Sequence, residues 1–116
     1  MKAITDYFKA PIKEYPRVKV SELVEDETVF EILDITIKDN LQDKDGRIYT
    51  AAFVTINPLD KEDLSHAEGN IYSVMVTQEV LLECMNYLCD NGHDGKYTIK
   101  AVDTKKGRSY YNLFEL

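Results

Sequence analysis

The feature that most constrains this chain is a pair of alternating segments joined by an Asp-Gly turn. Apolar and polar side chains alternate in residues 28–38 and again in residues 47–57, and the pattern places Leu33 on the buried face of the first segment. A period of two is typical of a β-strand with one buried face. Asp45-Gly46 lies between the segments, and glycine adopts the positive φ that tight hairpin turns require. The sequence therefore predicts a β-hairpin.

Three further strands and one helix are predicted along the rest of the chain. The strands are expected at residues 70–76, 96–103 and 108–116. Between the first two of them, apolar side chains recur at the i, i+3, i+4 and i+7 spacing of a half-buried helix, at Leu81, Cys84, Met85 and Leu88. Thr77 is the expected N-cap of this helix, and Asn91-Gly92 is its expected end.

The order of these elements predicts the fold class. Three strands, a helix and two strands match the OB-fold, a mainly β, five-stranded and partly open Greek-key barrel with one α-helix between the third and fourth strands. An SH3-like barrel would lack this helix, and a ferredoxin-like fold would need a second helix after the first strand. We assign residues 20–116 to the OB-fold domain and residues 1–19 to a basic, irregular N-terminal arm. One further helical turn is expected at residues 20–26, with Ser21 as its N-cap.

The charge of the chain is unevenly distributed. Its net charge of −7 argues against a uniformly basic surface of the kind that binds phosphates. Residues 1–19 and residues 96–116 each carry five basic and two acidic side chains, whereas residues 20–95 carry four basic and 17 acidic ones. Both ends of the sequence are therefore basic, and this polarity allows a local basic groove on an acidic protein.

Aromatic and basic side chains form the strongest functional pattern. On an OB-fold, oligonucleotides lie across the second and third strands, between the first and last hairpin loops. Tyr49 and Phe53 are predicted to point away from the aliphatic face of the second strand, where their rings can stack on unpaired bases. Basic side chains of the two hairpins would then bind the phosphates. The candidate contacts for nucleic acid are Lys38, Arg47, Tyr49, Phe53, Tyr72, Lys100, Lys105, Lys106 and Arg108.

Other chemistries fit the sequence poorly. Residues 43–48 resemble the middle of a calcium-binding loop, but Leu41 and Ala52 stand where such a loop needs acidic ligands. Cys84 and Cys89 lie on different faces of the predicted helix, without a second Cys/His pair, so we interpret them as thiols of the core rather than zinc ligands. The sequence shows neither a catalytic constellation nor a glycine-rich phosphate loop. We therefore predict a protein that is not an enzyme and that needs no metal or cofactor.

The chain resembles a known group of proteins. Its strand order, its basic N-terminal arm and the closing hairpin at residues 104–116 are similar to the small single-stranded DNA-binding proteins of bacteriophages. The resemblance covers about residues 20–116. It implies a homo-oligomer, most simply a dimer, that binds and protects DNA single strands during phage replication and recombination, with partners among the proteins of those processes. The chain differs from the wider class in lacking tryptophan and in ending on an apolar segment rather than an acidic tail.

A second hypothesis remains open. The acidic middle of the chain would suit a protein-interaction OB module, or a DNA mimic that occupies the basic site of a host protein. Neither hypothesis involves a membrane, because no apolar run approaches the roughly 20 residues that a membrane-spanning helix needs. The N-terminal residues lack the apolar stretch of a signal peptide, and the two cysteines fit a reducing compartment. We therefore expect the protein in the cytoplasm, which for a phage protein is that of the host cell.

Overall fold

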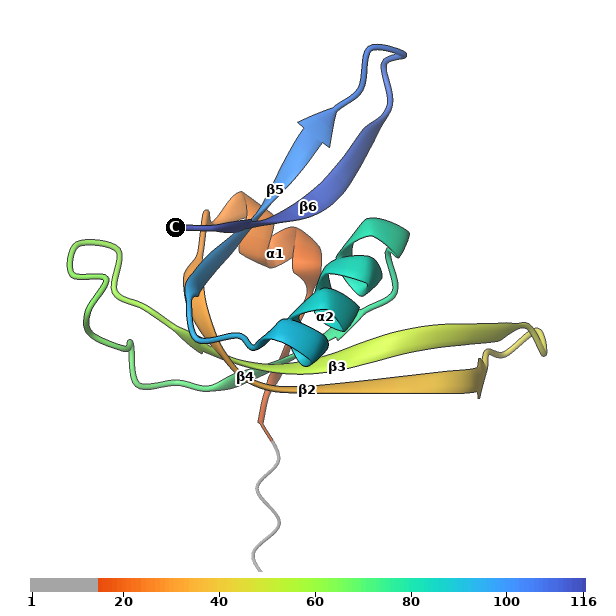
Figure 1. Cartoon of the computed structure of the whole chain (residues 1–116), viewed down its shortest axis with the longest axis horizontal. Coiled ribbons are helices and arrows are strands. Elements are labelled where there is room, and N and C mark those ends of the chain that lie inside the picture. The colour runs from red at the N-terminus through yellow and green to blue at the C-terminus, as the bar shows by residue number, and fades with distance from the viewer. Residues whose placement is uncertain (1–14) are drawn as a thin grey trace, which may run out of the picture.

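Six strands form one curled sheet in the computed structural model, which describes residues 15–116. The strands are β1 (Arg17–Val18), β2 (Val29–Gln42), β3 (Ile48–Pro58), β4 (Tyr72–Val76), β5 (Lys96–Asp103) and β6 (Ser109–Glu115). They lie in the order β1-β4-β3-β2-β5-β6, and every neighbouring pair is antiparallel except β1 with β4. The helices α1 (Val20–Glu25) and α2 (Glu79–Asn91) lie on the same side of the layer formed by β2, β3 and β4 (Figure 1).

The mainly β class is as predicted, but one strand was missed. Arg17 and Val18 form a strand that pairs with β4, although the sequence placed them in an irregular arm. The helical turn expected at residues 20–26 is present as α1, but its N-cap is Lys19 rather than Ser21 and makes no side-chain cap hydrogen bond. With β1 included, the sheet has six strands rather than five. The helix α2 therefore lies between the fourth and fifth strands rather than between the third and fourth. The rest of the predicted arm, residues 1–14, lies outside the described residues.

The strand β2 changes its inward-facing side part-way along its length. Phe30 and Ile32 are buried in the core before the change, and Ile35 and Ile37 pack against the core after it. A β-bulge lies between them, because Ile32 pairs with Ile56 whereas Asp34 pairs with the preceding residue of β3. The bulge adds one residue to β2 and reverses the alternation of its side chains. Leu33 is therefore 45% exposed, and its predicted place in the buried face is wrong.

The helix α2 packs one apolar stripe against the sheet. Leu81, Met85 and Leu88 are buried, as the helical spacing predicted. Cys84 is half-buried and Cys89 is exposed, so the interpretation of both thiols as core residues is wrong for Cys89. The N-cap is Gln78 instead of Thr77, and it makes no side-chain cap hydrogen bond. Gly92 ends the helix with a φ of 93° and donates its N–H to the Leu88 carbonyl (2.8 Å).

Side chains and backbone groups hold the connecting turns. In the β2–β3 turn, Gly46 has the positive φ that the sequence predicted, 79°, and its N–H donates to the Asp43 carbonyl (3.1 Å). In the β3–β4 loop, the N–H groups of Asp63 and Glu62 donate to Asp60 Oδ1 (3.0 and 2.8 Å), and these bonds hold the pKa of the Asp60 carboxyl below its ordinary value. The β2–β3 and β5–β6 hairpins extend away from the core in different directions (Figure 1).

None of the described helices combines the length and the apolar character that crossing a bilayer requires.

Candidate nucleic-acid interface

The alternation of β3 separates a core face from an outward face. Ala52, Val54 and Ile56 are buried in the core, on the side where the helices lie. Phe53 is between two of them in sequence and points to the opposite side, where it is half-buried and pairs with Thr36 of β2 and Met75 of β4. The structure therefore places the Phe53 ring where the sequence predicted it, away from the core.

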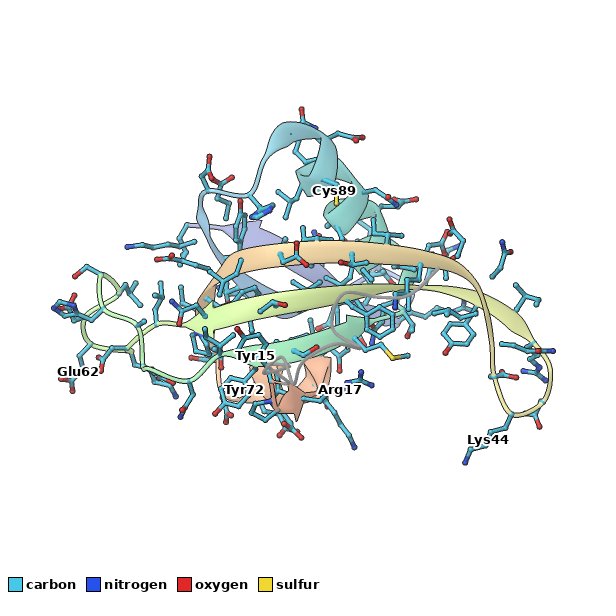
Figure 2. All side chains as sticks on the ribbon, turned by 90° about the horizontal axis from the view of Figure 1, so that it is seen from below. Tyr15, Arg17, Lys44, Glu62, Tyr72 and Cys89 are labelled. Carbon is cyan, nitrogen blue, oxygen red and sulfur yellow. The ribbon has the colours of Figure 1, made fainter. Side chains whose placement is uncertain are left out.

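Two cations approach the Phe53 ring from opposite sides of β3. Lys38 Nζ of β2 lies 5.2 Å from the ring centroid, and the guanidinium carbon of Arg17 lies 5.8 Å from it. Both distances are within the range of a cation–π interaction. Arg17 reaches the ring because β1 pairs with β4 and places Arg17 opposite Ser73. Arg17 also contacts Met75, with Nη1 3.8 Å from Sδ, and Figure 2 views this face of the sheet with Arg17 labelled.

Tyr49 and Tyr72 lie on different sides of the sheet. Tyr49 is half-buried and falls on the same face of β3 as Phe53, because the two are an even number of residues apart. Tyr72 pairs with Ile56 and packs against the hydrophobic core. Tyr72, a predicted nucleic-acid contact, therefore lies on the core side of β4, whereas Ser73 and Met75 point outward with Phe53.

The remaining predicted cations do not gather at Phe53. Arg47 is exposed beside the β2–β3 turn, and Lys105, Lys106 and Arg108 are exposed at the other hairpin, which points elsewhere (Figure 1). Lys100 lies on β5, with Nζ 5.9 Å from the ring centroid of Phe114 of β6. Of the nine predicted contacts, the structure places Lys38, Tyr49 and Phe53 on the same face of the sheet.

Sequence reasoning missed two residues of these aromatic–cation clusters. Arg17 was counted only as part of a basic arm, because nothing in the sequence shows that two residues of that arm pair with β4. Phe114 was assigned only to the strand predicted at residues 108–116, but it is 38% exposed at the edge of the sheet. Its alternation with Leu113, which packs against the core, was the available signal for its outward direction.

A carboxylate also lies near the outward face. The reversed alternation after the bulge places Asp34 on the same side of β2 as Thr36 and Lys38, and Thr36 Oγ1 donates to Asp34 Oδ2 (3.3 Å). The next carboxylate along β2, that of Asp39, accepts a hydrogen bond from Thr50 Oγ1 (3.0 Å), and Thr50 shares the opposite face of β3 with Ala52. Among residues 15–116, the cations seen over the Phe53 ring are therefore Lys38 and Arg17, and a carboxylate lies further along the same side of β2.

Comparison with known proteins does not assign this surface. No protein-family model, no curated protein and no solved structure matches the chain. Within residues 15–116, no group of three or more His, Cys, Asp or Glu side chains is placed to hold a metal ion. The case for a function therefore depends on the geometry of the described side chains.

Proposed function

We propose that this chain binds single-stranded DNA, largely independently of sequence, through the outward face of β2, β3 and β4. The observation that carries the proposal is the Phe53 ring, which is partly exposed between Lys38 and Arg17. An unpaired base offers a flat π-face that can stack on such a ring, and each stacked base contributes about 1–3 kcal/mol. The two cations come from strands on either side of β3, so phosphates on both sides of a stacked base have a positive partner.

The strand arrangement supports an OB-type barrel that is left open. The long strand β2 pairs with both β3 and β5, α2 follows the three-stranded meander β2-β3-β4, and the hairpin β5–β6 completes the order. In OB-folds the second and third barrel strands carry the oligonucleotide. These correspond here to β3 and β4, which present Phe53 and Met75 on the outward face. The position of the Phe53 ring therefore agrees with the expected position of a ligand on this fold.

Titration with a labelled dT oligomer tests the proposal. Fluorescence anisotropy at low salt should show saturable binding, and log K should fall with log[salt] by about 0.7 for each phosphate that is neutralised. The same titration with a blunt-ended duplex of equal length should show weaker binding, because the bases of a duplex are already stacked on one another. Absence of binding to dT at low salt would refute the proposal.

A pair of phenylalanine variants locates the surface. Phe53→Ala should weaken dT binding by about 5-fold to 150-fold, the equivalent of one lost stacking interaction. Phe114→Ala removes the same type of ring from the other aromatic–cation cluster and is the matched control. Equal affinities of the wild-type chain and Phe53→Ala would mean that DNA binds elsewhere on the protein.

A further inference from the structure

An apolar groove lies between α2 and β6, on the side of the molecule away from the Phe53 face. Its volume is about 360 Å³, and its apolar lining includes Val80, Tyr87, Leu88 and Leu113. The residues that α2 contributes are spaced as one side of a helix, next to the stripe that packs into the core. The side of α2 next to its core stripe therefore borders an open groove, and Leu88 belongs to both.

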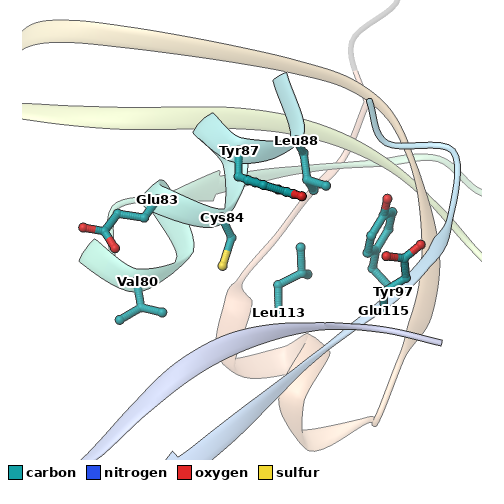
Figure 3. Close-up of a pocket in the computed structure, with 8 residues that line it drawn as sticks. All are labelled: Val80, Glu83, Cys84, Tyr87, Leu88, Tyr97, Leu113 and Glu115. Atoms are coloured by element: carbon teal, nitrogen blue, oxygen red, sulfur yellow. The ribbon is translucent and has the colours of Figure 1, made fainter. Parts of the chain in front are cut away.

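Contacts between the helix and the edge strand form the base of this groove. Cys84 Sγ of α2 donates to Asn112 Oδ1 of β6 (3.5 Å) and joins the two elements. Tyr87 lies one helical turn after Cys84 and is 65% exposed at the groove. Figure 3 shows the Tyr87 ring and Leu113 on either side of the space between α2 and β6. Contiguous apolar patches, rather than single exposed rings, mark surfaces that bind a partner, and Tyr87 is contiguous with the apolar lining of the groove.

The ends of the groove are negatively charged. Figure 3 shows Glu83 and Glu115 at opposite ends of the lining residues. Gly95 permits the position of Glu115, because a Cβ atom on residue 95 would lie 2.5 Å from Glu115 Oε1. The helix carries three acidic side chains and no lysine or arginine. In residues 15–116 the one ion pair joins His66 and Asp63, so neither carboxylate of the groove is paired there with a cation.

We propose that this groove binds a polypeptide segment of a partner protein, in which a leucine- or phenylalanine-sized side chain is flanked by lysine or arginine. The apolar lining can take one such side chain out of water, and cations on either side of it can reach Glu83 and Glu115. The exposed Tyr87 ring offers a further cation–π contact. The same charge repels a polynucleotide, so the groove and the Phe53 face select ligands of opposite charge. The inference stands independently of DNA binding.

Binding of synthetic peptides to the full chain tests this inference. The probe is a labelled peptide of leucine and lysine, and its acidic counterpart contains leucine and glutamate in the same positions. We expect saturable binding of the basic peptide, with backbone amide shifts confined to α2, β6 and the start of β5. Comparable binding of the acidic peptide, or amide shifts concentrated on another surface, would overturn the proposal.

Charge-reversal variants separate the groove from the general acidity of the protein. Glu83→Lys should weaken binding of the basic peptide by about tenfold or more, because it places a like charge at one end of the groove. Glu62→Lys makes the same change in the β3–β4 loop, where Glu62 is also exposed (Figure 2), and should change the affinity by less than about twofold. Equal losses in the two variants would mean that the peptide responds only to net charge, and would refute the site.

A second copy of the chain is the competing occupant. Light scattering at several concentrations of the wild-type chain and of Tyr87→Ala measures this alternative. Tyr87 is largely exposed, so its replacement should leave the fold intact and weaken binding of the basic peptide. If the wild-type chain self-associates and Tyr87→Ala is monomeric, the groove is an interface between copies and the proposed partner is wrong. An oligomeric state unchanged by Tyr87→Ala, with a lower peptide affinity, supports the partner segment.

Discussion

The outward face around Phe53 and the groove between α2 and β6 both expose an aromatic ring beside apolar neighbours, but they differ in charge. Lys38 and Arg17 flank Phe53, whereas Glu83 and Glu115 mark the two ends of the groove. The net charge of −7 is a sum over the whole chain, so it does not show where charges of either sign lie on the surface. The comparison shows that an acidic chain can present a small cationic aromatic surface, here with the Asp34 carboxylate on the same side of β2.

The largest expected effect tests whether Phe53 lies outside the core at all. Ile56→Ala removes a side chain that is 1% exposed, on the core face of the same strand, and should lower the free energy of unfolding by about 2–5 kcal/mol. Phe53→Ala should cost clearly less, because the ring is only half-buried and lies outside the core cluster. Urea denaturation of both variants measures the difference. A loss as large for Phe53→Ala as for Ile56→Ala would make Phe53 a core residue and end the comparison.

Two tyrosines sharpen the comparison between the faces of the sheet. Tyr49→Ala should weaken dT binding by about 1–3 kcal/mol, because it removes a ring from the Phe53 face. Tyr72→Ala should leave dT binding unchanged and lower the thermal stability instead, because Tyr72 packs against the core. Anisotropy titrations and melting curves of both variants distinguish the two effects. The opposite result, with affinity lost in Tyr72→Ala alone, would place the nucleic acid on the other face.

Removal of the two cations gives a smaller, salt-dependent effect. Arg17→Ala and Lys38→Ala should each reduce the slope of log K against log[salt] by about 0.7, because each variant neutralises one phosphate fewer. Lys44→Ala removes an exposed cation at the tip of the β2–β3 hairpin (Figure 2) and is the matched control. An equal change of slope in Lys44→Ala would show that the polynucleotide runs along the hairpin instead of lying between Arg17 and Lys38.

The smallest effect concerns the independence of the two surfaces. Glu83→Lys should change the dT affinity by less than about twofold at 0.1 M salt, because the Debye length of about 10 Å screens a charge on the other side of the sheet. Titrations of this variant with the dT oligomer and with the basic peptide measure the affinities of both surfaces on one protein. A large gain in dT affinity would show that DNA also reaches the α2 side.

Local sequence patterns predicted the elements well. The alternation of residues 47–57, the glycine at position 46 and the apolar stripe of α2 depend on neighbours in the chain, and the structure has each of them. The direction of Phe53 also followed from alternation within a single strand.

Features that depend on distant segments could not be predicted. Arg17 approaches Phe53 through the pairing of β1 with β4, which joins residues more than 50 positions apart, and no local pattern marks that contact. By contrast, the core side of Tyr72 could have been inferred locally, because Tyr72 alternates with Val74 and Val76 in β4. The groove arises where a helix and the last strand meet, so neither segment alone indicates that Tyr87 and Leu113 share a surface.

The bulge at Leu33 decides on which side of the sheet Lys38 lies. Upstream of the bulge, even-numbered residues of β2 face the core, and downstream of it odd-numbered residues do. If residues 29–38, Leu33 included, formed a regular strand without the bulge, strict alternation would bring Lys38 to the helix side and turn Ile35 and Ile37 to solvent. By taking up one additional backbone unit, the bulge therefore keeps a lysine beside an aromatic ring more than a dozen residues away, and deletion of Leu33 would straighten β2 with Lys38 still on the Phe53 side.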